Sequence, residues 1–340
     1  MRAVIETWLL RHWYGTHRPP LLLRMLEPIY HAVFQYSQRK RQSSMAHRRS
    51  GLPVIVVGNI TVGGSGKTPL VIRLCQLARE MNFRPGIVST GYGRQSAATL
   101  AVGPNGDPVT CGDEPVLLAI RTGSPVVVAQ RRADAIEKLS DMSVDLVIAD
   151  DGLQQADLDR DMEICVIDGA RGLGNGHLLP AGPLREPGGR LGQVDYVITN
   201  GVWVGKPDSV DAIVMELKAG KLCSLDNAVK MMTEEFRQAN YGNAVHAIAG
   251  IGNPKRFVLT LDALGIEAIP HAFPDHHSYS RKDFNSITPD SAIIMTEKDA
   301  VKCRLLGLEN AWYLPVVTHL PDHFENTFKT HLAKLMEKRR

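Results

Sequence analysis

Short apolar runs alternate with helical patterns between residues 53 and 200. Six runs of five or six residues predict buried strands, at 53–57, 86–90, 125–129, 145–149, 163–168 and 195–200. Between several of these runs, apolar residues recur every three or four positions and predict helices at 67–82, 113–123 and 131–141. Alternation of this kind is typical of a mostly parallel sheet with helices on both faces, so we expect an α/β fold.

A second, shorter alternating series begins near residue 241. It consists of apolar runs at 244–254, 266–273, 292–300 and 311–316, with helices predicted to begin at Lys255 and Asp322. The segment 206–240 carries short strand patterns and turns, which we interpret as a β-hairpin linker. We therefore expect a first domain over 51–205, this linker, and a second, smaller αβ lobe over 241–340.

The first 50 residues differ from the rest of the chain in pattern and charge. An apolar stripe that includes Trp8 and Trp13 is followed by a second apolar segment and then by a basic cluster. The segment holds nine Lys and Arg but only two Glu, so it is net positive while the remainder is net negative. This combination predicts amphipathic helices on an anionic membrane surface. A helix pair packed on the core, with a solvated basic tail, is the alternative.

Composition narrows the class of protein further. A hydrophobic content of 44% and a charged content of 22% in 340 residues indicate a globular chain of about two domains. No apolar run is long enough for a transmembrane helix, and the N-terminus lacks a signal-peptide pattern. The five cysteines are scattered and form no C-x-x-C pair, which argues against disulfides or a zinc site. We expect no nucleic-acid partner and no obligate protein partner.

The segment 58–69, GNITVGGSGKTP, lies between a predicted strand and a predicted helix. A glycine-rich loop in that position directs backbone N–H groups and a helix N-terminus toward a phosphate. It departs from the usual pattern G-x-x-x-x-G-K-[ST], because Thr61 stands where the first glycine is expected. We still predict a nucleotide site in which Lys67 reaches the phosphates and the Thr68 hydroxyl binds Mg²⁺. Its residues would be Thr61, Val62, Gly63, Gly64, Ser65, Gly66, Lys67 and Thr68.

An apolar strand that ends in two acids, VDLVIADDGLQQ, follows at 144–155. Acids at the carboxyl end of a strand face the crevice where ligands bind in open α/β sheets. Asp150 and Asp151 are therefore candidates for holding Mg²⁺ with Thr68. An acidic turn without a metal is the alternative.

Four further motifs carry polar residues with two interpretations each. Asp113 and Glu114 in GDEP (112–115) are either a base for an incoming hydroxyl or the capping acids of a helix. His276 in DHHSY (275–279) either tunes such a base or belongs to a polar loop. The arginines of QRRAD (130–134) and LREP (184–187) either neutralise phosphate oxygens or are solvated surface.

The ordered set of motifs resembles one family, the tetraacyldisaccharide 4′-kinases of lipid A biosynthesis in Gram-negative bacteria. The matching segments are GNITVGGSGKTP, GYGR (91–94), GDEP, ADDGLQ (149–154), PAGPLREP (180–187), AGIGNP (249–254), FPDHHSY (273–279) and TEKDAVK (296–302). The resemblance implies a P-loop NTPase-like fold of two αβ lobes joined by a β-hairpin. It also implies Mg²⁺-dependent transfer of the ATP γ-phosphate to the 4′-hydroxyl of tetraacyldisaccharide 1-phosphate, which gives lipid IVA. The N-terminal helix would lie on the cytoplasmic face of the inner membrane, where the lipid-linked substrate is found.

The resemblance assigns roles to single residues by motif. Asp113 would be the catalytic base, paired with His276, and Lys67 and Asp151 would act with them on the phosphates. The further positions that it matches around the substrate and the transition state are Glu114, Arg131 or Arg132, Gln154, Arg185 and Glu186. It does not decide between Arg131 and Arg132.

Two other functions fit parts of the pattern. One is a soluble P-loop kinase for a small metabolite, which would not need the N-terminal helices. The other is a nucleotide switch that binds a partner at the membrane and hydrolyses its nucleotide slowly. The switch is disfavoured because TEKD (296–299) does not match the guanine-reading N/T-K-x-D motif.

Overall fold

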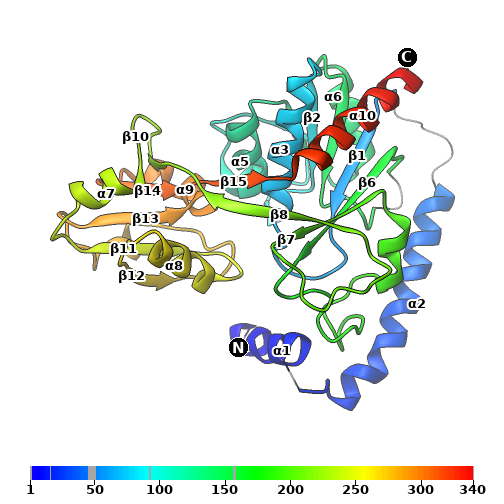
Figure 1. The fold of residues 1–340 in the computed structure, drawn as a ribbon, viewed down its shortest axis with the longest axis horizontal. Helices are drawn as coiled ribbons and strands as arrows, with labels where there is room; N and C mark the ends of the chain where they lie inside the picture. Colours follow the sequence, from blue (N-terminus) through cyan, green and yellow to red (C-terminus); the bar gives the residue numbers. More distant parts are fainter. Residues whose placement is uncertain (1, 16, 45–50, 92, 156–157, 340) are drawn as a thin grey trace.

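The computed structural model describes residues 2–15, 17–44, 51–91, 93–155 and 158–339. Part of the predicted basic cluster, including Arg48 and Arg49, lies outside the described residues, and so does Tyr92 of the GYGR motif. The structure has two sheets with helices packed on them, which confirms the predicted α/β class (Figure 1). We call the nine-stranded sheet with its helices the first lobe, and the six-stranded sheet with its helices the second lobe.

The first lobe is built on a mostly parallel sheet in the order β15-β8-β7-β6-β1-β5-β2-β4-β3. All six strands predicted between residues 53 and 200 are present. The sheet also contains β3 at one edge and β15 at the other, which pair antiparallel with their neighbours. The strands are β1 (Val54–Gly58), β2 (Pro85–Ser89), β3 (Leu100–Val102), β4 (Val126–Val128), β5 (Leu146–Asp150), β6 (Met162–Asp168), β7 (Tyr196–Asn200), β8 (Ala212–Ala219) and β15 (Val316–His319).

Helices cover both faces of this sheet because its central strands are apolar on both faces. In β1, Ile55 and Val57 belong to the core under α3 and α5, whereas Val54 and Val56 belong to the core under α6. All four side chains are fully buried. The helical segments of this part of the chain are α3 (Lys67–Glu80), α4 (Pro108–Cys111), α5 (Asp113–Thr122), α6 (Arg132–Ser140) and the 3-10 helix η1 (Gly188–Gln193).

The second lobe has a smaller sheet in the order β10-β9-β14-β13-β11-β12. Its strands are β9 (Leu222–Ser224), β10 (Lys230–Met231), β11 (Val245–Ala249), β12 (Ile269–Ala272), β13 (Ala292–Thr296) and β14 (Ala311–Leu314). Its helical segments are α7 (Thr233–Ala239), α8 (Pro254–Ala263), η2 (Arg281–Phe284), α9 (Glu297–Cys303) and η3 (Arg304–Leu306). The four parallel strands β12, β11, β13 and β14 reproduce the second alternating series of the sequence.

The two lobes are connected by a pair of strands that lie far apart in the sequence. Strand β8 enters the second lobe and β15 leaves it, and the two pair antiparallel from Val316 opposite Ala219 to His319 opposite Glu216. The hairpin-like connection is therefore not contained within residues 206–240. Its second strand comes after the second lobe, because the chain has to return before it can pair.

The last helix, α10 (Asp322–Arg339), packs on the first lobe and lies across α3 (Figure 1). Its buried side chains Phe324, Phe328 and Leu332 complete the core that α3 shares with the sheet. Arg73 of α3 forms a bidentate ion pair with Glu325, with Nη2 2.6 Å from Oε2. The apolar stripe of α10 thus covers α3, although sequence order groups this helix with the second series.

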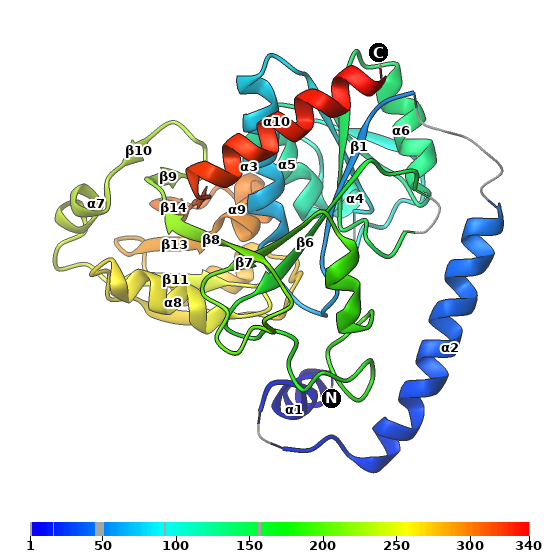
Figure 2. The same cartoon turned by 45° about the vertical axis from the view of Figure 1, so that its right-hand side comes forward.

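Two N-terminal helices, α1 (Arg2–Tyr14) and α2 (Leu21–Ser44), flank the loops at one edge of the first lobe (Figure 2). Tyr30 of α2 donates a hydrogen bond to the carbonyl of Arg185, and Gln38 donates one to the carbonyl of Gln154. Large apolar side chains of these helices stay exposed, namely Ile5, Trp8, Leu21, Leu22, Met25, Leu26, Ile29, Val33 and Tyr36. Within the described residues, no helix combines the length and apolar character that crossing a bilayer requires.

Candidate active site

The glycine-rich loop connects β1 to α3 as the sequence predicts. Gly63 and Gly66 have φ angles of 107° and 95°, in the region that favours glycine. Gly66 is the N-cap of α3 and provides no side chain, so the first N–H groups of the helix face the loop. A Cβ at Gly66 would lie 2.9 Å from Nδ2 of Asn200. The loop therefore has the backbone shape that binds a phosphate, with Lys67 and Thr68 in the first helical turn.

The long loop 171–193 pairs with the glycine-rich loop through backbone hydrogen bonds. The N–H of Val62 donates to the carbonyl of Pro183 at 2.9 Å, and the N–H of Arg185 donates to the carbonyl of Ile60 at 2.7 Å. An antiparallel bridge joins Thr61 to Leu184. This pairing sets Arg185 and Glu186 beside the P-loop, which explains why a loop of this length is ordered against the sheet.

Asp151 is surrounded by cations at the carboxyl end of β5. It has a φ of 52°, and its Oδ1 lies 3.5 Å from Nζ of Lys67. Nη1 of Arg185 lies 3.4 Å from both of its carboxylate oxygens. Burial raises the pKa of Asp151, but Lys67 and Arg185 outweigh burial and hold it below the ordinary value. The side chain is therefore an ionised carboxylate at neutral pH.

The buried Arg132 supports the two acids through their backbone. Its Nη2 donates to the carbonyls of Asp150 and Asp151 at 2.6 and 2.9 Å. Arg131, in contrast, has a side chain that is 71% exposed and pairs with Asp134 at 3.8 Å. Of the two arginines between which the sequence could not decide, Arg132 faces the acids and Arg131 faces away.

Asp150 has a buried carboxylate that a bound cation would stabilise. It is 2% exposed, and its Oδ1 has no hydrogen-bond partner among the residues that the structure describes. Burial and, to a smaller extent, the charge of Glu114 raise the pKa of Asp150 to about 7, although Lys67 opposes the rise. Bound Mg²⁺ would reverse this shift, because a nearby divalent cation favours the ionised carboxylate.

The oxygen ligands at this site suit a Mg²⁺ ion that is also bound by the phosphates of a nucleotide. Mg²⁺ is usually held by one or two carboxylates together with substrate phosphates and water. No cluster of three or more His, Cys, Asp or Glu side chains in the described part of the chain could hold a metal ion by itself. Thr68, Asp150 and Asp151 thus match a site that needs the nucleotide to be complete.

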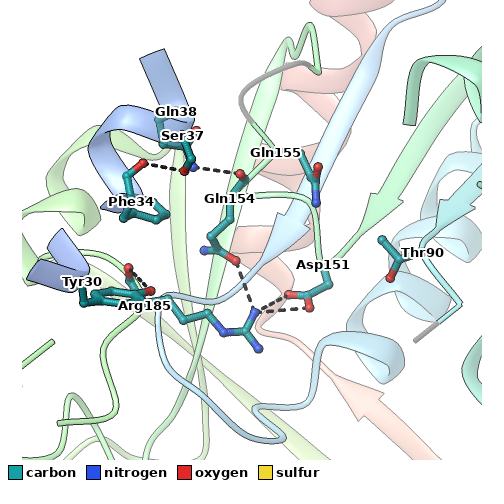
Figure 3. Close-up of a pocket in the computed structure, with 9 residues that line it drawn as sticks. All are labelled: Tyr30, Phe34, Ser37, Gln38, Thr90, Asp151, Gln154, Gln155 and Arg185. Atoms are coloured by element: carbon teal, nitrogen blue, oxygen red, sulfur yellow. Dashed lines mark hydrogen bonds and ion pairs between the residues drawn. The ribbon is translucent and has the colours of Figure 1, made fainter. Parts of the chain in front are cut away.

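A cavity of 310 Å³ opens between α2 and Asp151 (Figure 3). Gln154 crosses its floor, where Nε2 donates to Glu186 at 2.7 Å and to the carbonyl of Asn59 at 2.8 Å. Oε1 of the same residue accepts from Arg185 at 3.3 Å. The lining residues are Tyr30, Phe34, Ser37, Gln38, Thr90, Asp151, Gln154, Gln155 and Arg185. One wall is therefore an N-terminal helix and the other carries predicted site residues.

A second group of site residues forms where the two lobes meet. Asp113 is the first residue of α5, where Gly112 packs on Gly91 just beyond the end of β2. His276 lies in the loop after β12 with a φ of 60°. Although the two residues are 163 positions apart, Nδ1 of His276 lies 3.1 Å from Oδ2 of Asp113. The structure therefore brings together the acid and the imidazole that the resemblance paired.

The pKa values at this contact are shifted in opposite directions. Burial raises the pKa of Asp113, but the hydrogen bond with His276 and the charge of Lys298 more than offset burial, so the net shift is downward. The same hydrogen bond raises the pKa of His276 above its ordinary value, against burial and Lys298. Asp113 is thus held as a carboxylate with an imidazole bound to it.

Several residues of the site were not predicted. Lys298 of α9 lies 3.2 Å from Glu114 and 3.5 Å from Asp275, and Lys302 lies 3.9 Å from Asp113. The TEKDAVK motif contains both lysines, but spacing alone gave no partner for them.

Asn200, at the carboxyl end of β7, lies against Gly66 and was not predicted either. Arg256 of α8 donates to its Oδ1 at 3.2 Å, so the second lobe reaches the strand ends beside the P-loop. The position of an amide directly at the end of a predicted strand was the available signal.

The comparisons with known proteins bear on this arrangement. A family model described as tetraacyldisaccharide-1-P 4′-kinase matches residues 20–334, which is most of the chain. The chain belongs to this family.

Relatives named tetraacyldisaccharide 4′-kinase match the chain over almost its whole length. One from Hahella chejuensis is 46% identical over 339 residues, covering 96% of this chain and 97% of the relative. One from Methylobacillus flagellatus is 42% identical over 341 residues, covering 99% of both chains. A crystal structure described as the "apo" form of LpxK from Aquifex aeolicus in complex with ATP superposes with a TM-score of 0.74. It is 28% identical to this chain and covers 92% of it and 97% of the Aquifex chain.

Membership of the tetraacyldisaccharide-1-P 4′-kinase family confirms the resemblance found in the motifs. The likeness to the Aquifex structure confirms the P-loop kinase fold, including a second lobe. In the glycine-rich loop, the positive φ angles fall on Gly63 and Gly66 and not on Thr61, so the position of the first glycine in the usual pattern does not require a glycine here.

Proposed function

We propose that this kinase transfers the γ-phosphate of ATP to the 4′-hydroxyl of tetraacyldisaccharide 1-phosphate, which gives lipid IVA. The observation that carries the proposal is the hydrogen bond of 3.1 Å between His276 and Asp113. It joins the base on the P-loop lobe to an imidazole from the opposite lobe, as a transferase needs and a nucleotide switch does not. Glu114, the neighbour of Asp113, also raises the pKa of Asp150, so the two groups of site residues act on each other electrostatically.

The phosphates of ATP would be bound by the P-loop. The backbone N–H groups of residues 61–66 and the first turn of α3 would surround them, and Lys67 would contact the β- and γ-phosphates. Thr68, Asp150 and Asp151 would hold Mg²⁺, which neutralises phosphate charge when it is bound. Lys67 already contacts Asp151 at 3.5 Å, so it is held near that position before the nucleotide arrives.

Asp113 would act as the base for the acceptor hydroxyl. The 4′ oxygen forms a bond to the γ-phosphorus while the bond from that phosphorus to the β–γ bridging oxygen breaks, and ADP leaves. The hydroxyl proton moves to the carboxylate of Asp113, while His276 holds that carboxylate by its hydrogen bond. Positioning and charge neutralisation supply most of the catalysis in such a transfer.

Arginines and hydrogen-bonded neighbours would keep the acids and the substrate in place. Arg132 fixes the backbone of both acids, and Arg185 lies between Asp151 and Gln154. Glu186 accepts from Gln154 and lies 3.4 Å from Arg190. Arg185 is the cation that opens to the cavity, so it is the arginine that we expect to contact a substrate phosphate.

We also propose that the enzyme works at the cytoplasmic face of the inner membrane. Four acyl chains keep the acceptor in a bilayer, so the site has to approach the membrane surface. The exposed apolar residues of α1 and α2, including Trp8 at 43% and Leu22 at 68%, support this location. Tyr30 and Phe34 of α2 also line the cavity, so the helix that would meet the membrane is a wall of the site.

The proposal is tested by phosphate transfer from ATP to tetraacyldisaccharide 1-phosphate in detergent micelles. We expect wild-type transfer, and a loss of about 10²–10⁴-fold in Asp113→Asn, since general base catalysis contributes that much. ATP binding, measured by calorimetry, should persist in this variant because Asp113 is outside the P-loop. Lipid-independent hydrolysis of ATP without transfer would instead support the nucleotide switch. Transfer to soluble sugars in preference to the lipid would support the metabolite kinase.

A further inference from the structure

Lys298 lies at the centre of the contact between the two lobes. It is in the first turn of α9, and its side chain is 17% exposed. Its Nζ lies 3.2 Å from Glu114 Oε1, 3.5 Å from Asp275 Oδ1 and 4.0 Å from Asp113 Oδ2. It also lies 3.5 Å from Nε2 of His276. A single ammonium group thus contacts the base, the imidazole and two further acids from both lobes.

The contact with Nε2 defines where the proton of His276 resides. A lysine ammonium only donates hydrogen bonds, so an Nε2 atom that faces it has to accept. A neutral imidazole that accepts at Nε2 carries its proton on Nδ1. That Nδ1–H then points at Asp113 Oδ2, 3.1 Å away. Lys298 therefore donates to His276, and His276 donates to Asp113, which only accepts.

The ammonium also opposes a second proton on the imidazole. A protonated His276 would present an Nε2–H to Lys298, with two positive groups in contact. The other charged groups around this contact are Asp113 and Glu114 from α5, Asp275 from the histidine loop, and Asp299 and Lys302 from α9. In agreement with the geometry, Lys298 lowers the pKa of both His276 and Asp113, although for each the hydrogen bond between them has the larger effect.

We propose that Lys298 is a positioning residue for phosphate transfer: it fixes the tautomer of His276 and keeps the Asp113–His276 pair in the form that accepts a proton. The assignment rests on the proposed role of Asp113 as the base. Lys298 itself needs no contact with the reacting atoms, since it acts through the imidazole and the carboxylate.

The pH profile of the transfer reaction tests this role. Lys298→Gln removes the charge, and we expect the acidic limb of kcat/KM to move up by roughly one pH unit, because a nearby charge shifts a pKa by that order. At pH values below the limb, kcat/KM of Lys298→Gln should be about tenfold lower than that of the wild type, and at higher pH the two should become equal. Lys298→Arg should leave the limb in place. Lys282→Gln, which removes an exposed charge from the same lobe, is the matched control and should also leave it in place. A rate that falls equally at every pH in Lys298→Gln would overturn the proposal.

A spectroscopic readout separates this inference from the proposed function. In ¹⁵N-histidine-labelled full-length protein, the His276 signals are identified by their loss in His276→Gln. We expect protonated Nδ1 and unprotonated Nε2 in the neutral ring, and a higher titration midpoint in Lys298→Gln than in the wild type. A ring protonated on Nε2, or an unchanged midpoint, would refute the role of Lys298. Absence of lipid phosphorylation by the wild type would refute the proposed function, whatever the tautomer.

Discussion

The ion pair between Arg121 and Glu297 allows the contact between the lobes to be tested away from the chemistry. Arg121 lies in the last turn of α5 in the first lobe, and Glu297 is the first residue of α9 in the second. Nη1 of Arg121 lies 2.5 and 2.7 Å from the two carboxylate oxygens, and Nη2 donates to the carbonyl of Val316 on β15 at 3.3 Å. The side chains are only 20% and 10% exposed. Arg121→Met therefore leaves a buried carboxylate without its cation.

The size of the effect follows from this burial. Removing one partner of a buried pair costs about 3–5 kcal/mol, and we expect about 3 kcal/mol here because Arg121 keeps some contact with water. An unfolding entropy of about 2.1 cal/mol/K per residue amounts to roughly 0.7 kcal/mol/K for 340 residues, so this loss lowers the midpoint of thermal unfolding by about 4 °C. Transfer activity should fall as well, because α9 carries Lys298 and holds the second lobe against Asp113.

Thermal unfolding followed by circular dichroism or calorimetry measures this loss. The control is Arg84→Met, which breaks an ion pair at 3.1 Å whose arginine is 65% exposed, and its midpoint should stay within about 2 °C of the wild type. The double variant Arg121→Met/Glu297→Met should recover most of the stability, since apolar side chains replace both charges. An Arg121→Met midpoint equal to that of Arg84→Met, or a double variant no more stable than the single one, would refute the reasoning.

The same variant should also respond to pH. Burial raises the pKa of Glu297, and Arg121 opposes this rise, so the pKa will be higher still in Arg121→Met. A raised folded-state pKa means that the folded protein binds more protons than the unfolded chain. Stability is then lost as the pH rises through the range between the two pKa values. The destabilisation by Arg121→Met should therefore be smallest near pH 5 and grow toward pH 7.

Three other predictions address the P-loop, the dyad and the N-terminal helices. Gly66→Ala introduces a Cβ at a φ of 95° and 2.9 Å from Asn200, so it should weaken ATP binding at least tenfold, as measured by calorimetry. Gly205→Ala is the control: it is also at positive φ but in open space, and it should leave ATP binding unchanged. The His276–Asp113 contact should stabilise the protein most between about pH 4 and pH 6.5. Above this range, stability is lost as the pH rises through the raised pKa of His276. Below it, stability is lost as the pH falls through the lowered pKa of Asp113. The midpoint difference between wild type and His276→Gln should thus be larger at pH 5.5 than at pH 8, and equal differences would contradict the ion pair. Trp8→Asp/Ile29→Asp should reduce binding to vesicles of anionic lipid, while Leu305→Asp, at a side chain 95% exposed on the second lobe, should leave binding unchanged.

Periodicity predicted those parts of the fold that depend on neighbouring residues. The strand from Val54 to Gly58 is apolar on both faces because helices cover both faces, and that pattern is visible in the sequence. Strand β3 was not predicted because it has only three residues and just one of them is buried. The pairing of β8 with β15 was beyond a local pattern, since the two strands are separated by the whole second lobe.

The sequence allowed the residues of the site to be predicted from their types and motifs, but not the contacts between their side chains. Lys67, Thr68 and the two acids at the end of β5 could be placed because a P-loop and a following strand converge at the same edge of a sheet. The choice between Arg131 and Arg132 depended on where α6 begins, and helix boundaries are poorly defined by pattern. Lys298 has its partners on α5 and in the histidine loop, so its role appeared only when the lobes were brought together.

The return of the chain through β15 and α10 has a consequence for biosynthesis. The first lobe is interrupted, because its edge strand and the helix that covers α3 are translated after the second lobe. On the ribosome, Leu70, Leu74 and the other apolar residues of α3 therefore lack part of their cover until residues 316–339 have emerged. The second lobe lies within one continuous stretch of the chain and has its own core, so it can fold while the ribosome still holds the segment that completes the first. The order of synthesis is thus the reverse of the order in which the two lobes become complete.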